Sequence, residues 1–70
     1  MDIQKLIGTN IRNLRTVASI SQEELAARMN VDQAYVSRLE AGQLNPTITT
    51  LEQIAAALEV EPKILLETHK

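Results

Sequence analysis

The sequence predicts a single all-helical domain made of five helices. Apolar residues recur at helical spacing in successive segments, and capping residues or helix terminators separate these segments. No stretch has the alternation of apolar and polar residues that is typical of a half-buried strand. The chain has 70 residues and no cysteine, so its core is small and has no disulfide to support it. Self-association is therefore an expected way of burying more apolar surface.

The first helix is expected over residues 3–17. Gly8 lies inside it and costs this helix about 1 kcal/mol relative to alanine. Gly8 is either a harmless surface residue or a point of close packing by another helix, and we favour close packing. The first helix has an apolar stripe at helical spacing, which comprises Ile3, Ile7, Ile11 and Leu14.

Two short helices with a very short connection follow. Ser21 begins the second helix as part of a capping box with Glu24, in which the Ser21 hydroxyl accepts from the Glu24 N–H and the carboxylate reaches back. This helix ends near Asn30, where the turn needs a positive φ that asparagine tolerates. Asp32 caps the third helix, which is expected over residues 33–41.

The remaining sequence predicts two further helices. Gly42 ends the third helix, and Pro46 prevents a helix from running through the loop that follows. Thr47 or Thr49 caps the fourth helix. The buried stripe of the fourth helix is expected to contain Leu51, Ile54, Ala55 and Leu58. Pro62 then begins a short C-terminal helix at about residues 61–67.

The connection between the second and third helices is the most informative feature. The small Ala26 allows close approach, Asn30 provides the turn and Val36 is the buried residue on the facing helix. These spacings suit two short helices that cross steeply around a tight turn. When Val36 and Leu39 face inward, the outward side of the third helix carries Gln33, Ala34, Ser37 and Arg38.

Four segments together resemble the Xre/Cro/phage-repressor-type helix-turn-helix family of transcriptional regulators. The matching segments are IRNLR at 11–15, SQEELA at 21–26, YVSRLEAG at 35–42 and LEQIAAAL at 51–58. The resemblance spans about residues 5–66 and implies a lambda-repressor-like five-helix domain, usually dimeric, that binds operator DNA. One departure is Asn30, where the family commonly has glycine.

The third helix is the expected recognition helix, because an α-helix fits the major groove of DNA. Gln33 can pair with an adenine edge, Ala34 can contact a thymine methyl, and Ser37 can bond to either base type. Arg38 can read a guanine or hold a phosphate. Each of these residues is otherwise an ordinary solvent-facing helix position.

Phosphate contacts are expected around this helix. Gln22 opens the second helix, whose free N–H groups suit an anion, and the resemblance implies that it contacts DNA. Tyr35 either bonds to a phosphate or covers the edge of the domain. Asn45, Thr47 and Thr49 lead into the fourth helix and form a second candidate site.

The resemblance also implies an ion pair between Arg15 and Glu40 that orients the recognition helix. The alternative is two exposed charges that contribute little. The expected dimer surface is the C-terminal helix. Its apolar residues either complete the core of the monomer, face a second copy, or do both. These residues are Val60, Ile64, Leu65 and Leu66.

The sequence therefore favours a homodimeric regulator that binds double-stranded operator DNA, with restriction–modification controller proteins as the best-fitting small members of the family. RNA polymerase is a further candidate partner if the protein activates transcription. The net charge of −2 favours the alternative, an antitoxin or another interaction module that keeps the fold. We expect no enzymatic activity, cofactor, metal or membrane span, and a cytoplasmic location. His69 is interpreted as a tail residue.

Overall fold

The structure is a computed structural model that describes residues 1–68, so His69 lies outside the described residues. Within this range the chain forms four α-helices and one 3-10 helix, without strands. No helix in residues 1–68 is both long and apolar enough to cross a membrane. The elements are α1 (Ile3–Val17), α2 (Gln22–Met29), α3 (Gln33–Glu40), α4 (Ile48–Leu58) and η1 (Pro62–Leu66).

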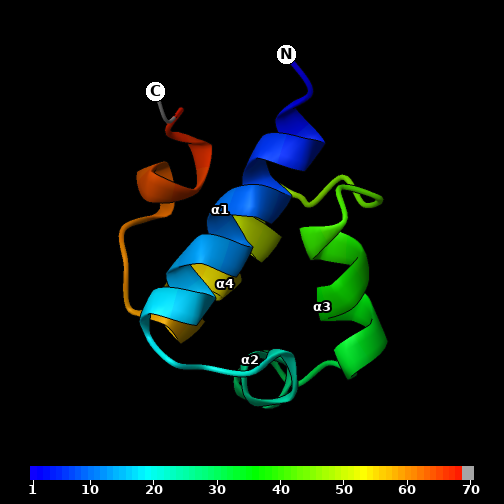
Figure 1. The fold of residues 1–70 in the computed structure, drawn as a ribbon, viewed down its shortest axis with the longest axis vertical. Helices are drawn as coiled ribbons and strands as arrows, with labels where there is room; N and C mark the ends of the chain where they lie inside the picture. Colours follow the sequence, from blue (N-terminus) through cyan, green and yellow to red (C-terminus); the bar gives the residue numbers. More distant parts are fainter. Residues whose placement is uncertain (69–70) are drawn as a thin grey trace.

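Helix α1 is the centre of the arrangement (Figure 1). It packs against α3 on one flank and against η1 on the other, and it also contacts α4, which lies behind it in the view. Helix α2 contacts both α3 and α4. The recognition-helix candidate α3 and the C-terminal segment η1 therefore lie on opposite flanks of α1.

Polar side chains fix the helix starts. Ser21 Oγ accepts from the N–H of Glu24 at 3.0 Å, and Asp32 Oδ1 accepts from the N–H of Tyr35 at 3.1 Å. Thr47, rather than Thr49, caps α4. The caps satisfy N–H groups that lack partners in the first turn of a helix. The cap predictions at Ser21 and Asp32 are confirmed.

The carboxylate half of the predicted capping box is absent from the described structure. The Glu24 carboxylate instead accepts from Arg28 Nε at 3.0 Å, one turn along α2. An additional cap, which the sequence analysis did not identify, starts α1: Asp2 Oδ1 accepts from the N–H of Lys5 at 3.2 Å.

Helix α2 ends where the sequence predicts a left-handed residue. Asn30 has φ 59° and ψ 43°, and its N–H bonds to carbonyl groups of the last turn of α2. The left-handed conformation lets the chain turn at once into α3. Helix α3 ends at Glu40, with Ala41 as its C-terminal cap, so it is one residue shorter than predicted.

The core is aliphatic and is formed by one face of every element. Most residues of the predicted apolar stripes are buried or half-buried, whereas Ile3, in the first turn of α1, remains 49% exposed. Ile20, in the loop after α1, joins the core. The buried apolar residues are Ile7, Ile11, Ile20, Leu25, Ala26, Val36, Leu39, Ile54, Ala55, Leu58 and Leu65.

The predicted fifth α-helix is instead the 3-10 helix η1. Five residues that begin with proline are too few for two α-helical turns, and the tighter i to i+3 bonding suits such short segments. The buried Asn10 side chain of α1 also holds this segment. Its Nδ2 donates to the carbonyl oxygens of Leu65 at 2.8 Å and Glu67 at 2.9 Å, which fixes η1 against α1.

Gly8 is a point of close packing, as predicted. A Cβ atom at this position would lie 2.5 Å from the carbonyl oxygen of Leu39 and 2.6 Å from that of Glu40. These are backbone atoms at the end of α3, so they cannot move aside as a flexible side chain could. Glycine at position 8 therefore allows α1 and α3 to approach.

We expect Gly8→Ala to destabilise the fold by about 1–3 kcal/mol, because overpacking outweighs the roughly 1 kcal/mol gain in helix propensity. Urea unfolding at a fixed protein concentration measures the change. Thr9→Ala, an exposed substitution on the same helix, is the control and should be neutral or slightly stabilising. Equal or greater stability of Gly8→Ala would contradict close packing at this point.

Candidate nucleic-acid interface

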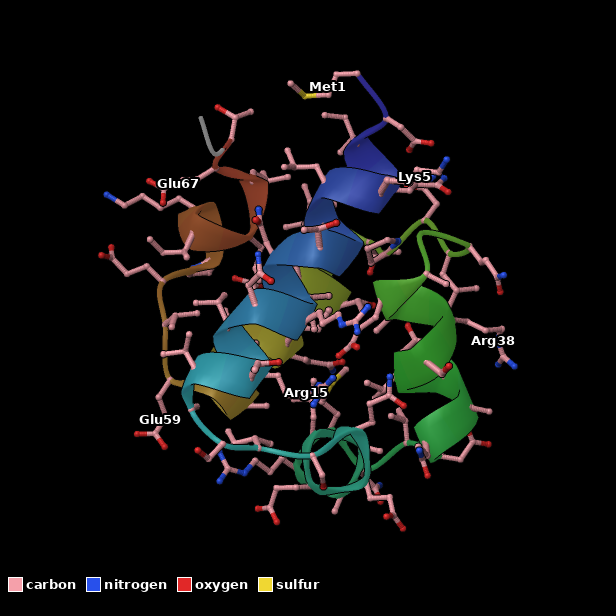
Figure 2. The ribbon with its side chains drawn as sticks, in the orientation of Figure 1. Met1, Lys5, Arg15, Arg38, Glu59 and Glu67 are labelled. Carbon is pink, nitrogen blue, oxygen red and sulfur yellow. The ribbon has the colours of Figure 1, made fainter. Side chains whose placement is uncertain are left out.

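The outward face of α3 carries four side chains at the positions expected from the sequence. Gln33, Ala34, Ser37 and Arg38 are exposed. The opposite face of the helix is buried through Val36 and Leu39. Figure 2 shows Arg38 pointing away from the body of the protein. The helix thus offers a polar face with amide, hydroxyl and guanidinium groups that its own chain leaves open to solvent.

The turn between α2 and α3 sets the angle of this face. Ala26 is buried at the point where α2 and α3 pack, and the N–H of Val31 donates to the Ala26 carbonyl oxygen at 2.9 Å. Asn30 adopts the left-handed conformation between them. The predicted clamp of Ala26, Asn30 and Val36 is therefore present.

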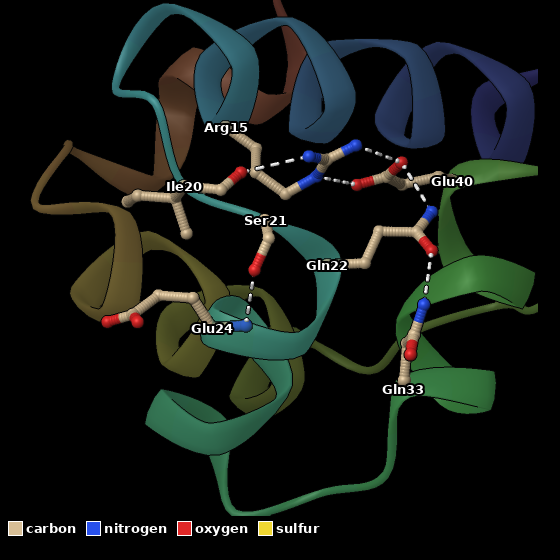
Figure 3. A network of polar contacts seen from close by, with 7 residues as sticks. All are labelled: Arg15, Ile20, Ser21, Gln22, Glu24, Gln33 and Glu40. Atoms are coloured by element: carbon tan, nitrogen blue, oxygen red, sulfur yellow. Dashed lines mark hydrogen bonds and ion pairs between the residues drawn. The ribbon is translucent and has the colours of Figure 1, made fainter.

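An ion pair joins α1 to the last residue of α3 (Figure 3). Arg15 Nε donates to Glu40 Oε2 at 2.6 Å, and a second guanidinium nitrogen donates to Glu40 Oε1 at 3.0 Å. The third nitrogen donates to the carbonyl oxygen of Ile20 at 2.9 Å. The side chains of Arg15 and Glu40 are only 14% and 5% exposed, so this pair is largely shielded. The predicted Arg15–Glu40 pair is confirmed.

Two glutamine side chains extend this network toward the outer face. Gln22 Nε2 donates to Glu40 Oε1 at 3.1 Å, and Gln33 Nε2 donates to Gln22 Oε1 at 3.3 Å (Figure 3). The four residues come from α1, α2 and α3. The structure thus brings together two predicted structural residues and two predicted DNA contacts in one hydrogen-bonded chain.

The network sets the charge state of the ion pair. Burial alone would raise the pKa of Glu40, but hydrogen bonds from Arg15 and then Gln22, with the charges of Arg15 and Arg12, lower it overall. The hydrogen bond to Glu40 raises the pKa of Arg15 despite the opposing effect of burial. Both partners are therefore charged at neutral pH.

The other predicted phosphate contacts have varied surroundings. Tyr35 is half-buried and packs against the core, which fits the expectation that its ring covers the domain edge. Thr47 Oγ1 accepts from the N–H of Thr50 at 3.1 Å. Asn45 and Thr49 are exposed. Asn45, Thr47 and Thr49 lie in the loop before α4 and in its first turn, apart from the Arg15–Gln33 network.

A polar recess of about 300 Å³ lies between α1, α2 and α3. Arg12, on the exposed side of α1, lines it together with Gln22 and Ser37. Sequence reasoning counted Arg12 only as a charge. The spacing of three residues between Arg12 and Arg15 could have placed both arginines on one side of α1.

The electrostatics of this side differ from those of the whole chain. Among residues 1–68 the ion pairs are Arg15–Glu40 and Arg28–Glu24, so Arg12 and Arg38 keep unpaired positive charges.

The same described residues contain no group of three His, Cys, Asp or Glu side chains that could hold a metal ion.

Comparison with known proteins identifies the family. A family model described as Helix-turn-helix (HTH_3) matches residues 11–65, which include α2, α3 and α4. The chain belongs to the HTH_3 helix-turn-helix family. This finding agrees with the resemblance of its sequence motifs to the Xre/Cro/phage-repressor type.

Relatives of this HTH_3 protein include named regulators. It is 47% identical over 60 residues to the uncharacterized HTH-type transcriptional regulator y4dJ of Sinorhizobium fredii, covering 86% of this chain and 78% of the relative. The crystal structure of the restriction–modification controller protein C.AhdI from Aeromonas hydrophila has a TM-score of 0.84 and 37% identity, covering 89% of this chain and 94% of that one.

A second controller protein has been crystallised with DNA. The C.Esp1396I tetramer in complex with its natural 35 base-pair operator matches with a TM-score of 0.83 and 31% identity. The match covers 93% of this HTH_3 chain and 86% of that chain. The helical architecture described above is therefore shared along nearly the whole length of both proteins.

The structure of the C-terminal segment of this HTH_3 protein corrects the prediction for one interface residue. Leu65 is 0% exposed and belongs to the core of the monomer, so it has no surface to offer a second copy. Leu66 is 47% exposed, and Val60 and Ile64 are half-buried. The 3-10 geometry of η1 directs Leu65 inward and leaves its neighbours toward solvent.

The lowered pKa of Glu40 predicts a pH-dependent contribution to stability. Folding lowers this pKa, so the ion pair stabilises the fold above the unfolded-state value of about 4.3, and this contribution is lost as the pH falls through the lower folded-state value. We expect Glu40→Gln to be about 1–2 kcal/mol less stable than wild type at pH 7, and the difference to shrink as the pH falls from neutral to below the unfolded-state value.

Urea unfolding across this pH range measures the difference. Glu52→Gln, an exposed substitution on α4, is the matched control and should give a small difference that does not change with pH. A constant gap between wild type and Glu40→Gln would contradict the assigned charge of the pair.

Proposed function

We propose that this HTH_3 protein is a sequence-specific DNA-binding transcriptional regulator that binds its operator as a homodimer. The observation that carries the proposal is the outward face of α3, which is polar and exposed while its opposite face is held in the core. Relatives named transcriptional regulators, and a related controller protein crystallised with its operator, support the proposal.

In this proposal α3 lies in the major groove and reads base edges. Gln33 accepts from and donates to an adenine, and Ser37 bonds to a neighbouring base. Arg38 reaches a guanine or a phosphate, and Ala34 contacts a thymine methyl. Their placement on one exposed face of one short helix supports this assignment.

Contacts with the DNA backbone position the helix in the groove. Gln22 at the start of α2 has one amide N–H engaged by Glu40 and a second available for a phosphate. Tyr35 contributes its hydroxyl from the domain edge. Asn45, Thr47 and Thr49 approach the backbone at the start of α4, where exposed N–H groups suit an anion.

Arg12 is the additional phosphate contact that the structure suggests. It lines the same recess as Gln22 and Ser37, and its charge is unpaired among residues 1–68. Together with Arg38 it supplies local positive charge on a chain whose net charge is −2. DNA affinity then comes from a few placed cations rather than from a general positive field.

The proposed dimer surface combines η1 with the end of α1. Val17 is 86% exposed, and with Leu14 and Ile64 it borders a largely apolar hollow of about 210 Å³. We include Leu66, which is 47% exposed, and the half-buried Val60 in this surface. A second copy that covers it would bury apolar area that a domain of this size needs. Operator half-sites would then lie about 34 Å apart, one turn of the duplex.

The relatives also suggest a biological role. Similarity to controller proteins favours control of a restriction–modification locus, with RNA polymerase as the partner if the protein activates transcription. A protein that binds an operator acts where the DNA is, so we expect it in the cytoplasm. We assign it no enzymatic step.

Selection of bound sequences from random DNA tests the function. We expect wild type to enrich a two-fold symmetric site, and Gln33→Ala to lose about 1–3 kcal/mol of binding and to relax preference at one base position per half-site. Arg12→Gln should weaken binding to all sequences alike and reduce the slope of log affinity against log salt by about 0.9 per contact.

Lys63→Gln, on η1 and away from the recess, is the matched control and should leave the salt slope unchanged. If wild type enriches no sequence at micromolar concentration, the regulator proposal fails. The protein is then better described as an antitoxin or another interaction module that keeps the fold, an alternative that its acidic balance favours.

Leu66→Asp tests the dimer surface. A charge in this apolar surface should convert the protein to monomers in sedimentation velocity and weaken operator binding. Ile48→Asp, at a position that is 79% exposed in the first turn of α4, is the matched control and should remain dimeric. A Leu66→Asp variant that stays dimeric would indicate that the interface lies on another surface.

A further inference from the structure

The hydrogen-bonded chain from Glu40 to Gln33 has a direction. A carboxylate can only accept hydrogen bonds, whereas an amide side chain can donate from one end and accept at the other. Glu40 Oε1 therefore requires the NH₂ group of Gln22 to face it, at 3.1 Å. This leaves Gln22 Oε1 facing the other way, where it accepts from Gln33 Nε2 at 3.3 Å. The charge on Glu40 thus dictates the orientation of both amides (Figure 3).

The orientation of the two amides is fixed from the buried end of the hydrogen-bonded chain toward its exposed end. Both oxygens of Glu40 bond to Arg15, and the Glu40 side chain is only 5% exposed, so it cannot turn away from the network. Gln22 is half-buried and Gln33 is exposed. The outermost amide is therefore the one with the least restraint of its own, and its orientation depends on the residues behind it.

The orientation determines what Gln33 offers to a ligand. Once one N–H of Gln33 is donated to Gln22, its Oε1 and its second N–H remain free. One acceptor beside one donor matches the major-groove edge of adenine, which presents an N6 donor and an N7 acceptor. A reversed Gln33 amide would use its Oε1 to accept from Gln22 and would present its two N–H donors to the base. Two donors suit the acceptors of guanine or thymine.

We propose that Glu40 is a specificity-determining positioning residue, which acts through Gln22 to hold Gln33 in the orientation that selects adenine. This inference rests on the proposed DNA-binding function and concerns residues that act at a distance from the DNA. The geometry that carries it is the run of hydrogen bonds from Glu40 through Gln22 to Gln33.

Glu40→Gln tests the direction of the chain while keeping its shape. Arg15 donates to both oxygens of Glu40, so either orientation of the new amide sets its NH₂ group against one Arg15 N–H. Position 40 then no longer fixes which end of the Gln22 amide faces it, and Gln33 loses its single orientation. The base read by Gln33 is first located as the position that Gln33→Ala relaxes. At that position we expect the selection ratio of adenine over guanine and thymine to fall at least about 5-fold in Glu40→Gln, the low end of what a bidentate contact discriminates.

A double-mutant comparison separates this role from general support of the fold. Gln22→Ala removes the middle of the chain and should relax the same base position. In the Gln22→Ala background, Glu40→Gln should cause no further change in base preference, because its effect has no route to Gln33. Additive effects on base preference would overturn the proposal.

Arg15→Lys is the matched control. It weakens the bidentate pair and lowers stability but leaves the carboxylate of Glu40 charged, so the adenine preference should persist while affinity falls. Folding of every variant is verified by circular dichroism and thermal unfolding before selection.

The outcomes distinguish this inference from the function on which it rests. If wild type enriches no DNA sequence, the proposed function fails. If wild type enriches a site but the Gln33 position does not prefer adenine, or if folded Glu40→Gln keeps the full preference, only the positioning role of Glu40 is overturned.

Discussion

The contact between α1 and the last turn of α3 is the constraint on which the rest of the structure depends. Helix α3 has eight residues, and a helix of that length is marginal in water without tertiary support. Its position comes from the close approach at Gly8 and from the Arg15–Glu40 pair, which both connect α1 to its C-terminal end. The turn at Asn30 fixes the other end. A short helix held at both ends can keep its outward face exposed without losing its orientation.

Local chemistry explains why much of this fold could be predicted. Ser21, Asp32 and Asn30 act within three or four residues of themselves, so the sequence near each one carries the necessary information. The buried faces of α2, α3 and α4 follow the helical period in the same way. The ion pair of Arg15 and Glu40 was expected from the family resemblance rather than from spacing.

The features that sequence reasoning missed depend on partners far along the chain. Asn10 is a polar residue in an amphipathic helix, and its carbonyl partner in Leu65 is 55 residues away. No local pattern indicates that η1 would be bound through its backbone, or that Leu65 would face inward from a 3-10 helix. The Gln22–Glu40 contact is similar, since it joins α2 and α3 only after they pack.

The way in which Asn10 holds the C-terminal segment has an evolutionary consequence. Its amide binds carbonyl oxygens, which every residue possesses, so attachment of η1 to α1 depends little on which side chains that segment carries. Outward positions such as Ile64 and Leu66 are therefore able to change without detaching the segment. Duplicated copies of such a protein could diverge in their choice of partner, and so avoid mixed pairs, while keeping the same fold and the same reading helix.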